Sequence, residues 1–184
     1  MENIQLHDKQ FRPFIKADAI DDAIRRIAER MNDALQGDTP LFLSILNGSF
    51  MFTSDLMKQI TVPGTQISFV KMASYTGTRS SGNVQELIGL KEDITGRTVV
   101  ILEDVIDSGR SMSHLLEYLR ARNPRRIIVA TLFYKPGALV CPVPVDYYGL
   151  ELGNDFVVGR GLDYDGLGRN YPDLYILDEP KESE

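Results

Sequence analysis

The sequence contains a single cysteine, Cys141, among its 184 residues. An internal disulfide is therefore impossible, and we expect a reducing compartment, the cytoplasm. Cys141 lies in an apolar stretch with several prolines, which favours a buried structural residue over a catalytic nucleophile. His7 and His114 lie far from each other and from the cysteine, so the sequence has no pattern of zinc ligands.

Long apolar runs and an excess of basic residues are also absent. No apolar run approaches the ~20 residues that cross a bilayer, and the first residues do not predict a signal peptide. The formal net charge of −6 argues against general nucleic-acid binding, because that requires a basic face. We therefore expect no membrane and no nucleic-acid partner. An acidic protein that binds a polyphosphate must concentrate its cations or use a metal ion, for which magnesium is the expected choice.

The order of apolar patterns predicts an α/β fold. Apolar runs of strand length alternate with stretches of helical periodicity, which favours a twisted, mainly parallel sheet with helices on both sides. Helices are expected at residues 18–34, at 50–60 and after 111, and strands at 41–46, 66–73, 84–90, 99–102, 127–133 and 145–150. The acids near the start of the first helix, Asp18, Asp21 and Asp22, are expected to face solvent. The length fits one domain with a core of its own.

The rest of the chain is organised around residues 99–112. Residues 99–102 are all apolar, which is typical of a strand in the middle of a parallel sheet. Three acids follow within five positions: Glu103, Asp104 and Asp107. A polar turn at 108–111 then precedes apolar residues at helical spacing. We predict a strand, a loop that carries the acids, and a helix.

The turn at 108–111 suits a phosphate group. Backbone N–H groups at the start of a helix are unpaired, and the helix dipole is positive there. Gly109 lets the backbone approach a ligand, Arg110 adds positive charge, and Ser108 and Ser111 supply hydroxyl donors. In open α/β sheets, ligands bind at the carboxyl ends of the strands, which is where this turn is expected.

The acids have two interpretations. They form either a solvated turn with Ser108 or Ser111 as the helix N-cap, or a site that holds sugar hydroxyls or magnesium, or accepts a proton. Because the acids follow a buried strand and precede a turn suited to phosphate, we favour the second interpretation.

Residues 103–111, Glu-Asp-Val-Ile-Asp-Ser-Gly-Arg-Ser, resemble the signature of the type I phosphoribosyltransferases, in the version carried by hypoxanthine (hypoxanthine-guanine) phosphoribosyltransferases. Further motifs follow the family's order from residue 45 to residue 169. The resemblance implies a Rossmann-like sheet in a single domain at 1–184, with a small hood from residues 1–16 and 140–184. It also implies purine salvage: transfer of 5-phosphoribosyl from 5-phosphoribosyl 1-diphosphate to hypoxanthine or guanine, which gives IMP or GMP and diphosphate, with Mg²⁺ as cofactor.

The resemblance assigns roles to the signature. Glu103 and Asp104 are implied to hold the ribose hydroxyls and to help place the metal, and Asp163 is implied as a further metal ligand. The backbone of 107–111 is implied to bind the 5-phosphate. Asp107 is the implied general base, near the imidazole nitrogen of the purine.

The diphosphate site is implied by three other stretches. Asn47 and Gly48 lie where the family keeps its diphosphate-binding loop, with a cis peptide bond before Asn47. Lysine or arginine is common at that position, so Asn47 removes a charge, and contact is expected through the backbone. Ser74 and Tyr75 resemble the start of a mobile lid at 74–82, and Arg169 corresponds to the diphosphate-binding arginine.

The purine site is implied by Lys135, Phe156 and Val157. The Lys135 ammonium is implied to donate to the 6-oxygen, and because it cannot accept, it favours an oxo group over the amino group of adenine. Phe156 is implied to stack on the ring, and the backbone of Val157 to bond its edge. Arg160 departs from the tyrosine that is common at its position.

Three alternatives stay open from the sequence. The chain could transfer the sugar to another base (xanthine, adenine or uracil), it could be a regulator of the same fold that binds nucleic acid, or it could be a phosphate-binding module without chemistry. Since members of the family usually form dimers or tetramers, we expect a homodimer or homotetramer.

Overall fold

The computed structural model describes residues 2–75 and 84–178. The elements in chain order are β1 (Ile4–Leu6), β2 (Lys9–Ile15), α1 (Ala17–Ala34), β3 (Leu41–Leu46), α2 (Phe50–Met57), β4 (Gln66–Tyr75), β5 (Val84–Ile88), β6 (Thr98–Ile106), α3 (Arg110–Arg120), β7 (Arg126–Tyr134), the 3₁₀ turn η1 (Pro136–Ala138), β8 (Tyr147–Glu151), β9 (Val157–Val158) and β10 (Leu174–Leu177).

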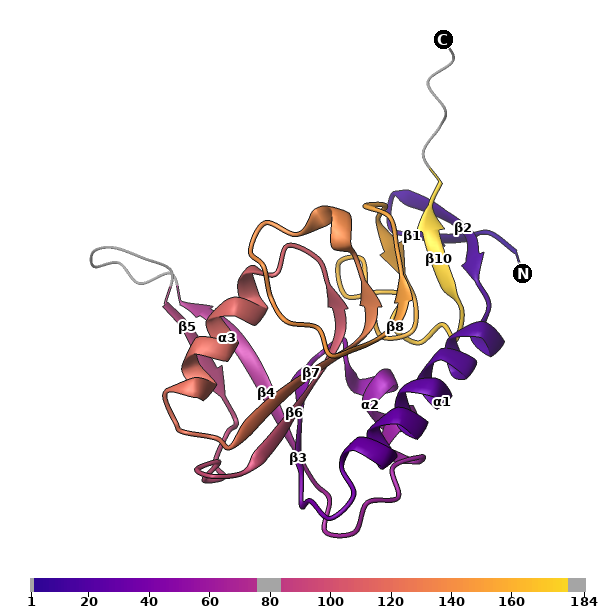
Figure 1. Cartoon of the computed structure of the whole chain (residues 1–184). Coiled ribbons are helices and arrows are strands. Elements are labelled where there is room, and N and C mark those ends of the chain that lie inside the picture. Colours follow the sequence, from indigo (N-terminus) through magenta and orange to yellow (C-terminus); the bar gives the residue numbers. More distant parts are fainter. Residues whose placement is uncertain (1, 76–83, 179–184) are drawn as a thin grey trace.

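The main sheet has the strand order β5-β4-β3-β6-β7-β8. Strands β4, β3, β6, β7 and β8 run parallel, and β5 pairs antiparallel with β4. Figure 1 shows α3 on one side of this sheet and α1 and α2 on the other. The expected α/β fold with a mainly parallel sheet is confirmed.

Burial explains why these strands occupy the centre. Nearly every residue of β3, and β7 from its third to its eighth residue, is buried, so neither strand has a solvent face. One apolar cluster packs α1 and α2 against the sheet, and a second packs α3 against its other face. In α1 the buried residues recur at helical spacing: Ile20, Ala23, Ile24, Ile27, Ala28 and Met31.

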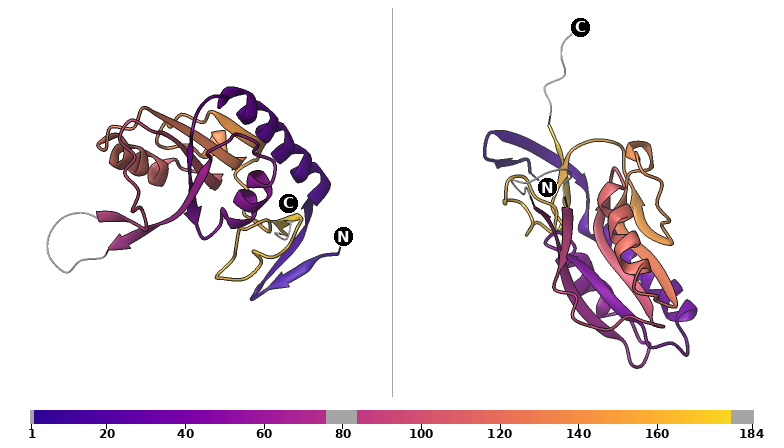
Figure 2. Two further views of the ribbon diagram at one scale, coloured as in Figure 1. Left: turned by 90° about the horizontal axis from the view of Figure 1, so that it is seen from below. Right: turned by 90° about the vertical axis from the view of Figure 1, so that its left-hand side faces the viewer.

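A second, four-stranded antiparallel sheet forms the hood, in the order β1-β2-β10-β9. Both views in Figure 2 place the N-terminal strands beside β10, next to the main sheet. Residues near the two ends of the chain are thus neighbours in space. Strand β8 belongs to the main sheet, so residues 140–184 divide between the hood and that sheet.

The central strand is longer than the sequence predicts. β6 continues to Ile106 and pairs with β7 as far as Tyr134, so Glu103 and Asp104 are strand residues. Of the three acids, only Asp107 lies in the loop. The expectation of an acidic loop was therefore wrong for two of the three positions, because the ladder with β7 outweighs the weak strand preference of acids.

The expected lid and the expected lack of a membrane-spanning helix can be compared with the described residues only. Ser74 and Tyr75 end β4 and pair with β5, whereas the rest of the expected lid, 76–82, lies outside the described residues. Within the described residues, no helix combines the length and the apolar character that crossing a bilayer requires.

Candidate active site

The turn that the sequence predicts to bind phosphate lies between β6 and α3. The N-cap residue of α3 is Gly109, with φ 75°, so the interpretation of Ser108 or Ser111 as the N-cap residue was wrong. A Cβ on Gly109 would lie 2.3 Å from the carbonyl oxygen of Cys141, so this position needs glycine for space as well as for its backbone angle. The Arg110 N–H donates a long hydrogen bond to Oγ of Ser108, at 3.5 Å, and Gly109 has no side chain that could bond the following N–H groups of α3. The start of α3 can therefore still donate to an anion.

The backbone at residues 140–141 is hydrogen-bonded to this turn. The backbone N–H groups of Val140 and Cys141 donate to the carbonyl oxygen of Ser108, at 2.9 and 3.0 Å. Cys141 itself is half-buried rather than buried, which corrects the expectation for its thiol. Its backbone, more than its side chain, contributes to the turn.

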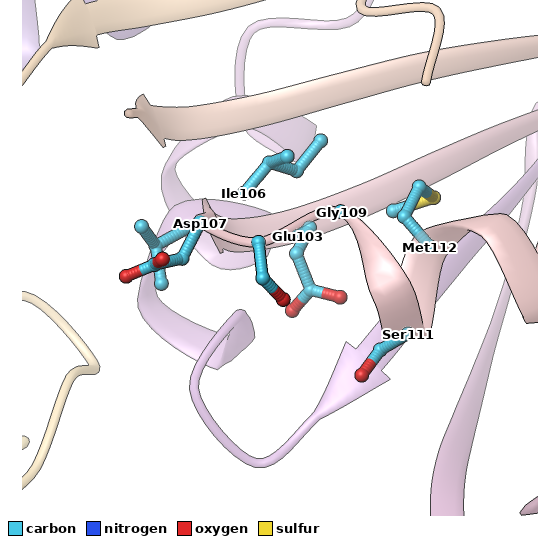
Figure 3. Close-up of a pocket in the computed structure, with 8 residues that line it drawn as sticks. Glu103, Ile106, Asp107, Gly109, Ser111 and Met112 are labelled. Atoms are coloured by element: carbon cyan, nitrogen blue, oxygen red, sulfur yellow. The ribbon is translucent and has the colours of Figure 1, made fainter. Parts of the chain in front are cut away.

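A cavity of about 120 Å³ opens beside the turn. Figure 3 shows Glu103, Asp107 and Ser111 around it, with Met112 at the start of α3. The cavity is lined by Glu103, Val105, Ile106, Asp107, Ser108, Gly109, Ser111 and Met112. Of the implied ribose and phosphate residues, all but Asp104 and Arg110 thus surround one space. Arg110 is exposed at its edge.

Glu103 and Asp104 form a pair of half-buried carboxylates. Burial raises the pKa of Glu103 well above its ordinary value, and the charge of Asp104 raises it further. Burial also raises the pKa of Asp104, although hydrogen bonds from Glu103 and from the Val105 N–H, and the charge of Arg169, act in the opposite direction. Two adjacent carboxylates that are costly to ionise form a site that a cation would stabilise.

The loop after β3 lies directly against Asp104. The peptide bond between Leu46 and Asn47 is cis, as the resemblance implied. A Cβ on Gly48 would lie 1.5 Å from Oδ2 of Asp104, so the implied diphosphate loop and the implied ribose site are in contact. Asn47 is exposed and Gly48 is buried. Below them, the hydroxyl of Ser44 bonds those of Ser49 and Thr53, both at 2.7 Å.

Lys135 and Asp107 meet at the other end of the site. Lys135 follows β7 and is only 6% exposed. Its Nζ lies 3.2 Å from Oδ2 of Asp107 and donates to the carbonyl oxygen of Asp155 at 2.9 Å. A donor and an acceptor that the sequence separates by 28 positions are therefore side by side.

Phe156 offers an accessible ring beside these groups, since it follows Asp155 directly and is 44% exposed. The rings of Phe11 and Tyr164 pack at 6.1 and 5.8 Å from its centroid. The Val157 side chain is buried, and the residue pairs with Ile176 of β10. Val157 can therefore reach a ligand through its backbone only.

Asp163 and Arg169 form an ion pair. Nη2 of Arg169 lies 2.7 Å from Oδ1 of Asp163, and its Nη1 donates to the carbonyl oxygen of Gly161 at 2.7 Å. Both side chains are 28% exposed. A Cβ on Gly161 would lie 2.0 Å from the carbonyl oxygen of Gly48, so this turn of the hood packs against the diphosphate loop.

The donor set fits magnesium. Within residues 2–75 and 84–178, no three acidic, histidine or cysteine side chains converge on one point. Magnesium is usually held by one or two carboxylates together with waters and substrate oxygens, and it does not require a closed protein cage. The Glu103–Asp104 pair meets that requirement.

The structure thus brings most of the sequence-predicted site residues together. The signature turn, the Asn47–Gly48 loop, the Lys135–Phe156 end and the Asp163–Arg169 pair lie around one region at the carboxyl ends of the strands, under the hood. The side chains of Ser74 and Tyr75 are not described. This arrangement offers hydrogen-bond donors for an anion, then a pair of carboxylates, then an exposed aromatic ring in this region.

A family model described as the phosphoribosyl transferase domain matches residues 16–165. The chain belongs to the phosphoribosyltransferase family. The resemblance seen in the signature is therefore confirmed at the level of the family.

Several proteins similar to this phosphoribosyltransferase are named hypoxanthine or hypoxanthine-guanine phosphoribosyltransferases. It is 44% identical over 146 residues to the hypoxanthine-guanine phosphoribosyltransferase of Mycobacterium tuberculosis, a match that covers 79% of this chain and 72% of the relative. It is 38% identical over 159 residues to the hypoxanthine phosphoribosyltransferase of Salmonella typhimurium, with 84% and 88% covered. A crystal structure of a hypoxanthine phosphoribosyltransferase from Staphylococcus aureus matches with a TM-score of 0.83 at 30% identity, covering 91% of each chain.

Sequence reasoning missed several groups that support the site. The carbonyl oxygen of Asp155 accepts from Lys135, and the only available signal was its position before Phe156. Arg160 is buried and pairs with Asp21 and Asp55. Asp21 is exposed as expected for an acid near the start of α1, but its carboxylate also has this partner, which helical periodicity does not reveal.

Proposed function

We propose that this protein is a hypoxanthine phosphoribosyltransferase that also accepts guanine. It transfers the 5-phosphoribosyl group from 5-phosphoribosyl 1-diphosphate to a 6-oxopurine and releases diphosphate. The names of the relatives support this proposal. The observation that carries it is the contact between Lys135 Nζ and Asp107 Oδ2, at 3.2 Å, beside the accessible ring of Phe156.

That contact matches one edge of a 6-oxopurine. The 6-oxygen and the N7 nitrogen are neighbours on the same edge. With Lys135 donating to the 6-oxygen, the Asp107 carboxylate lies next to N7 and accepts its proton, which makes Asp107 the general base. Phe156 stacks on the ring, worth about 1 kcal/mol, and the backbone of Val157 bonds the opposite edge.

The sugar phosphate is held by the signature. Backbone N–H groups of 107–111 bind the 5-phosphate at the N-terminus of α3, where Arg110 adds charge. Glu103 and Asp104 accept from the ribose hydroxyls. These contacts fix the anomeric carbon relative to the purine nitrogen, so catalysis here is largely positioning.

The leaving diphosphate is held from two sides. The backbone at Asn47 and Gly48 donates on one side, and Arg169 donates on the other after exchanging Asp163 for a phosphate oxygen. Ser74 and Tyr75 begin a lid that excludes water, a competing acceptor for the activated sugar. Arg169 neutralises charge that grows on the diphosphate as it leaves.

Magnesium fits the carboxylates of this site. Glu103 and Asp104 would hold it on the sugar side, and Asp163 on the diphosphate side. When bound, it supplies positive charge to the diphosphate in addition to that of Arg169, which suits a chain with a net charge of −6.

The test is diphosphate release with magnesium and 5-phosphoribosyl 1-diphosphate, with hypoxanthine, guanine, xanthine, adenine and uracil offered separately. Release with hypoxanthine or guanine and none with adenine is the expected result, because Lys135 donates and cannot accept. Preferred use of adenine or uracil would overturn the assignment of the base. No release with any base would leave a binding protein, and RNA retention would then be measured.

The role of Asp107 has its own test in Asp107→Asn. We expect turnover to fall about 100-fold, the scale of a general base, with little change in the affinity for the sugar donor. Asp165→Asn is the matched control, since this hood carboxylate is 86% exposed and pairs only with His7 among the described residues. Equal turnover in Asp107→Asn and the wild type would refute the assignment.

We further propose a homodimer or homotetramer that acts in the cytoplasm. The resemblance to the family supports the assembly, and the single cysteine supports the compartment. Light scattering after size exclusion measures the assembly, and a monomer at micromolar concentration would contradict it.

A further inference from the structure

Arg160 is a buried cation at a position where the family commonly has tyrosine. It is only 5% exposed. Its Nη2 bonds the carboxylates of Asp21 and Asp55, with 2.9 Å to Oδ2 of Asp55, and its Nη1 donates to the carbonyl oxygen of Pro172 at 3.3 Å. One guanidinium therefore connects the hood with α1, through Asp21, and with α2, through Asp55.

The charges around Arg160 balance one another, but burying the guanidinium has a cost in desolvation free energy. Asp55 also pairs with Lys58 at 3.0 Å, so two cations face two carboxylates. The Nε of Arg160 is buried and has no hydrogen-bond partner among the described residues. The guanidinium is buried, whereas the Asp21 side chain is 58% and the Asp55 side chain 27% exposed. The cost of removing the guanidinium from water offsets much of the attraction in such pairs. A role in stability alone is therefore a weak explanation for this residue.

The backbone of Arg160 belongs to the turn that touches the diphosphate loop. Its φ is 52°, and its N–H donates to the carbonyl oxygen of Tyr171 at 2.8 Å. The next residue, Gly161, packs so closely on the carbonyl oxygen of Gly48 that a Cβ would lie 2.0 Å from it. Gly161 also accepts from Arg169, which in turn pairs with Asp163.

The partner on α2 completes the connection. α2 begins at Phe50, directly after the diphosphate loop, and carries Asp55. The bond between Arg160 and Asp55 thus joins the turn to the helix that supports the loop. Asp21 fixes the same turn to α1, so the guanidinium limits movement of the turn in two directions.

We propose that Arg160 is a positioning residue for the diphosphate half of the reaction. Through Asp21 and Asp55 it holds the Gly159–Asp163 turn against the Asn47–Gly48 loop, and so sets where Arg169 and Asp163 meet the diphosphate. It touches no substrate itself. This inference rests on the proposed function, and it concerns the sugar donor rather than the purine.

The test compares Arg160→Gln with a matched control, Arg125→Gln. Arg125 also makes a long-range ion pair, with Asp38, together with a bond to Thr98, but it lies at the amino end of the strands, far from the turn. For each protein we would measure the KM values of both substrates, turnover, the thermal midpoint, and the affinity for 5-phosphoribosyl 1-diphosphate by calorimetry without a purine.

We expect Arg160→Gln to raise the KM of the sugar donor and to weaken its binding about tenfold, because a misplaced contact of about 1 Å has effects of that order or larger. The KM of hypoxanthine should stay at the wild-type value, and Arg125→Gln should match the wild type in both. An Arg160→Gln protein that loses thermal stability but keeps the donor KM would overturn the proposal. Equal increases in both KM values would do so too.

A milder variant covers the case in which Arg160→Gln does not fold. Asp55→Asn keeps the shape and the hydrogen-bond acceptor but removes the charge, and Asp21 still balances Arg160. It should weaken donor binding selectively and by a smaller factor, and Arg160→Lys should restore part of the loss seen in Arg160→Gln. An unchanged donor affinity in Asp55→Asn would overturn the proposal. If the wild type releases no diphosphate with any base, the proposed function fails, whereas donor calorimetry still tests the positioning role.

Discussion

Replacing Gly48 with alanine should disable the active site while leaving the fold intact. The new Cβ would lie 1.5 Å from Oδ2 and 2.4 Å from Cγ of Asp104. Ordinary contact between such atoms begins at 3.4 Å, so the Asp104 carboxylate has to retreat by about 2 Å. The φ of Gly48 lies outside the left-handed region, so alanine adds no backbone strain and the effect is steric.

The size of the effect follows from that displacement. A shift of about 1 Å in a positioned group can cost about 100-fold in rate, and the shift here is about twice as large. We therefore expect kcat/KM to fall at least about 100-fold, or about 3 kcal/mol of transition-state stabilisation. The thermal midpoint should change little, because the Asp104 side chain is only half-buried and the clash is with its carboxylate end, not with backbone.

The assay is steady-state diphosphate release with hypoxanthine, together with a thermal unfolding curve. Gly137→Ala is the control, since its Cβ would meet the Asn154 side chain at an ordinary 3.4 Å and its φ also lies outside the left-handed region. A Gly48→Ala protein with the kcat/KM of the wild type would refute the argued contact between the loop and Asp104. A large fall in the control as well would show that glycine is needed for another reason.

Two further predictions follow from the carboxylate pair and the aromatic face. Burial raises the folded-state pKa of Glu103 above its ordinary value of 4.5, so its contribution to stability is full below that pH and is lost as the pH rises through the folded-state pKa. Glu103→Gln should therefore unfold at a temperature about 2–4 °C higher than the wild type at pH 7.5, for a gain of about 1 kcal/mol in the free energy of unfolding. The difference between the two proteins should vanish near pH 4.5. A variant that is less stable than the wild type at neutral pH would contradict this prediction. Phe156→Leu should raise the KM of hypoxanthine about fivefold through lost stacking and leave the donor KM unchanged, and an unaffected hypoxanthine KM would rule out stacking as its role.

The main elements of the fold were predictable because their patterns are local. Residues 41–46 are an apolar run that forms β3 with the expected ends. The helix expected at 18–34 begins one residue earlier, and the strand expected at 127–133 extends one residue at each end. In each case the apolar residues that become buried, on both faces of a strand or along one side of a helix, form a pattern that is visible within a short window of sequence.

The hood was harder to predict because its strands are short and their partners distant. β9 has two residues and β10 has four, and β10 pairs with β2 near the other end of the chain. No local period marks elements of that length. The resemblance predicted a hood from the two chain ends, but not the register that places Phe11 against Phe156.

The candidate site also has a part that the sequence predicts and a part that it does not. The signature acids and the turn at 108–111 are contiguous, so the sequence displays them directly. The partners of Arg160 lie 139 and 105 positions away, and an exposed aspartate near the start of a helix looks the same with or without such a partner. Only the folded chain reveals which acids have a second role.

The free site is largely neutralised by its own residues. Lys135 pairs with Asp107, and Arg169 pairs with Asp163. The more distant charge of Arg169 also lowers the pKa of Asp104, but neither Glu103 nor Asp104 has an ion-pair partner within residues 2–75 and 84–178. The two cations are therefore not attracting a polyanion at full strength while their partners remain in place. A substrate that replaces Asp163 on Arg169 leaves one more carboxylate exposed, in a chain that already carries a net charge of −6. We therefore expect the diphosphate to bind more tightly when positive charge such as Mg²⁺ arrives with it, which would account for acidic pairs beside an anion site.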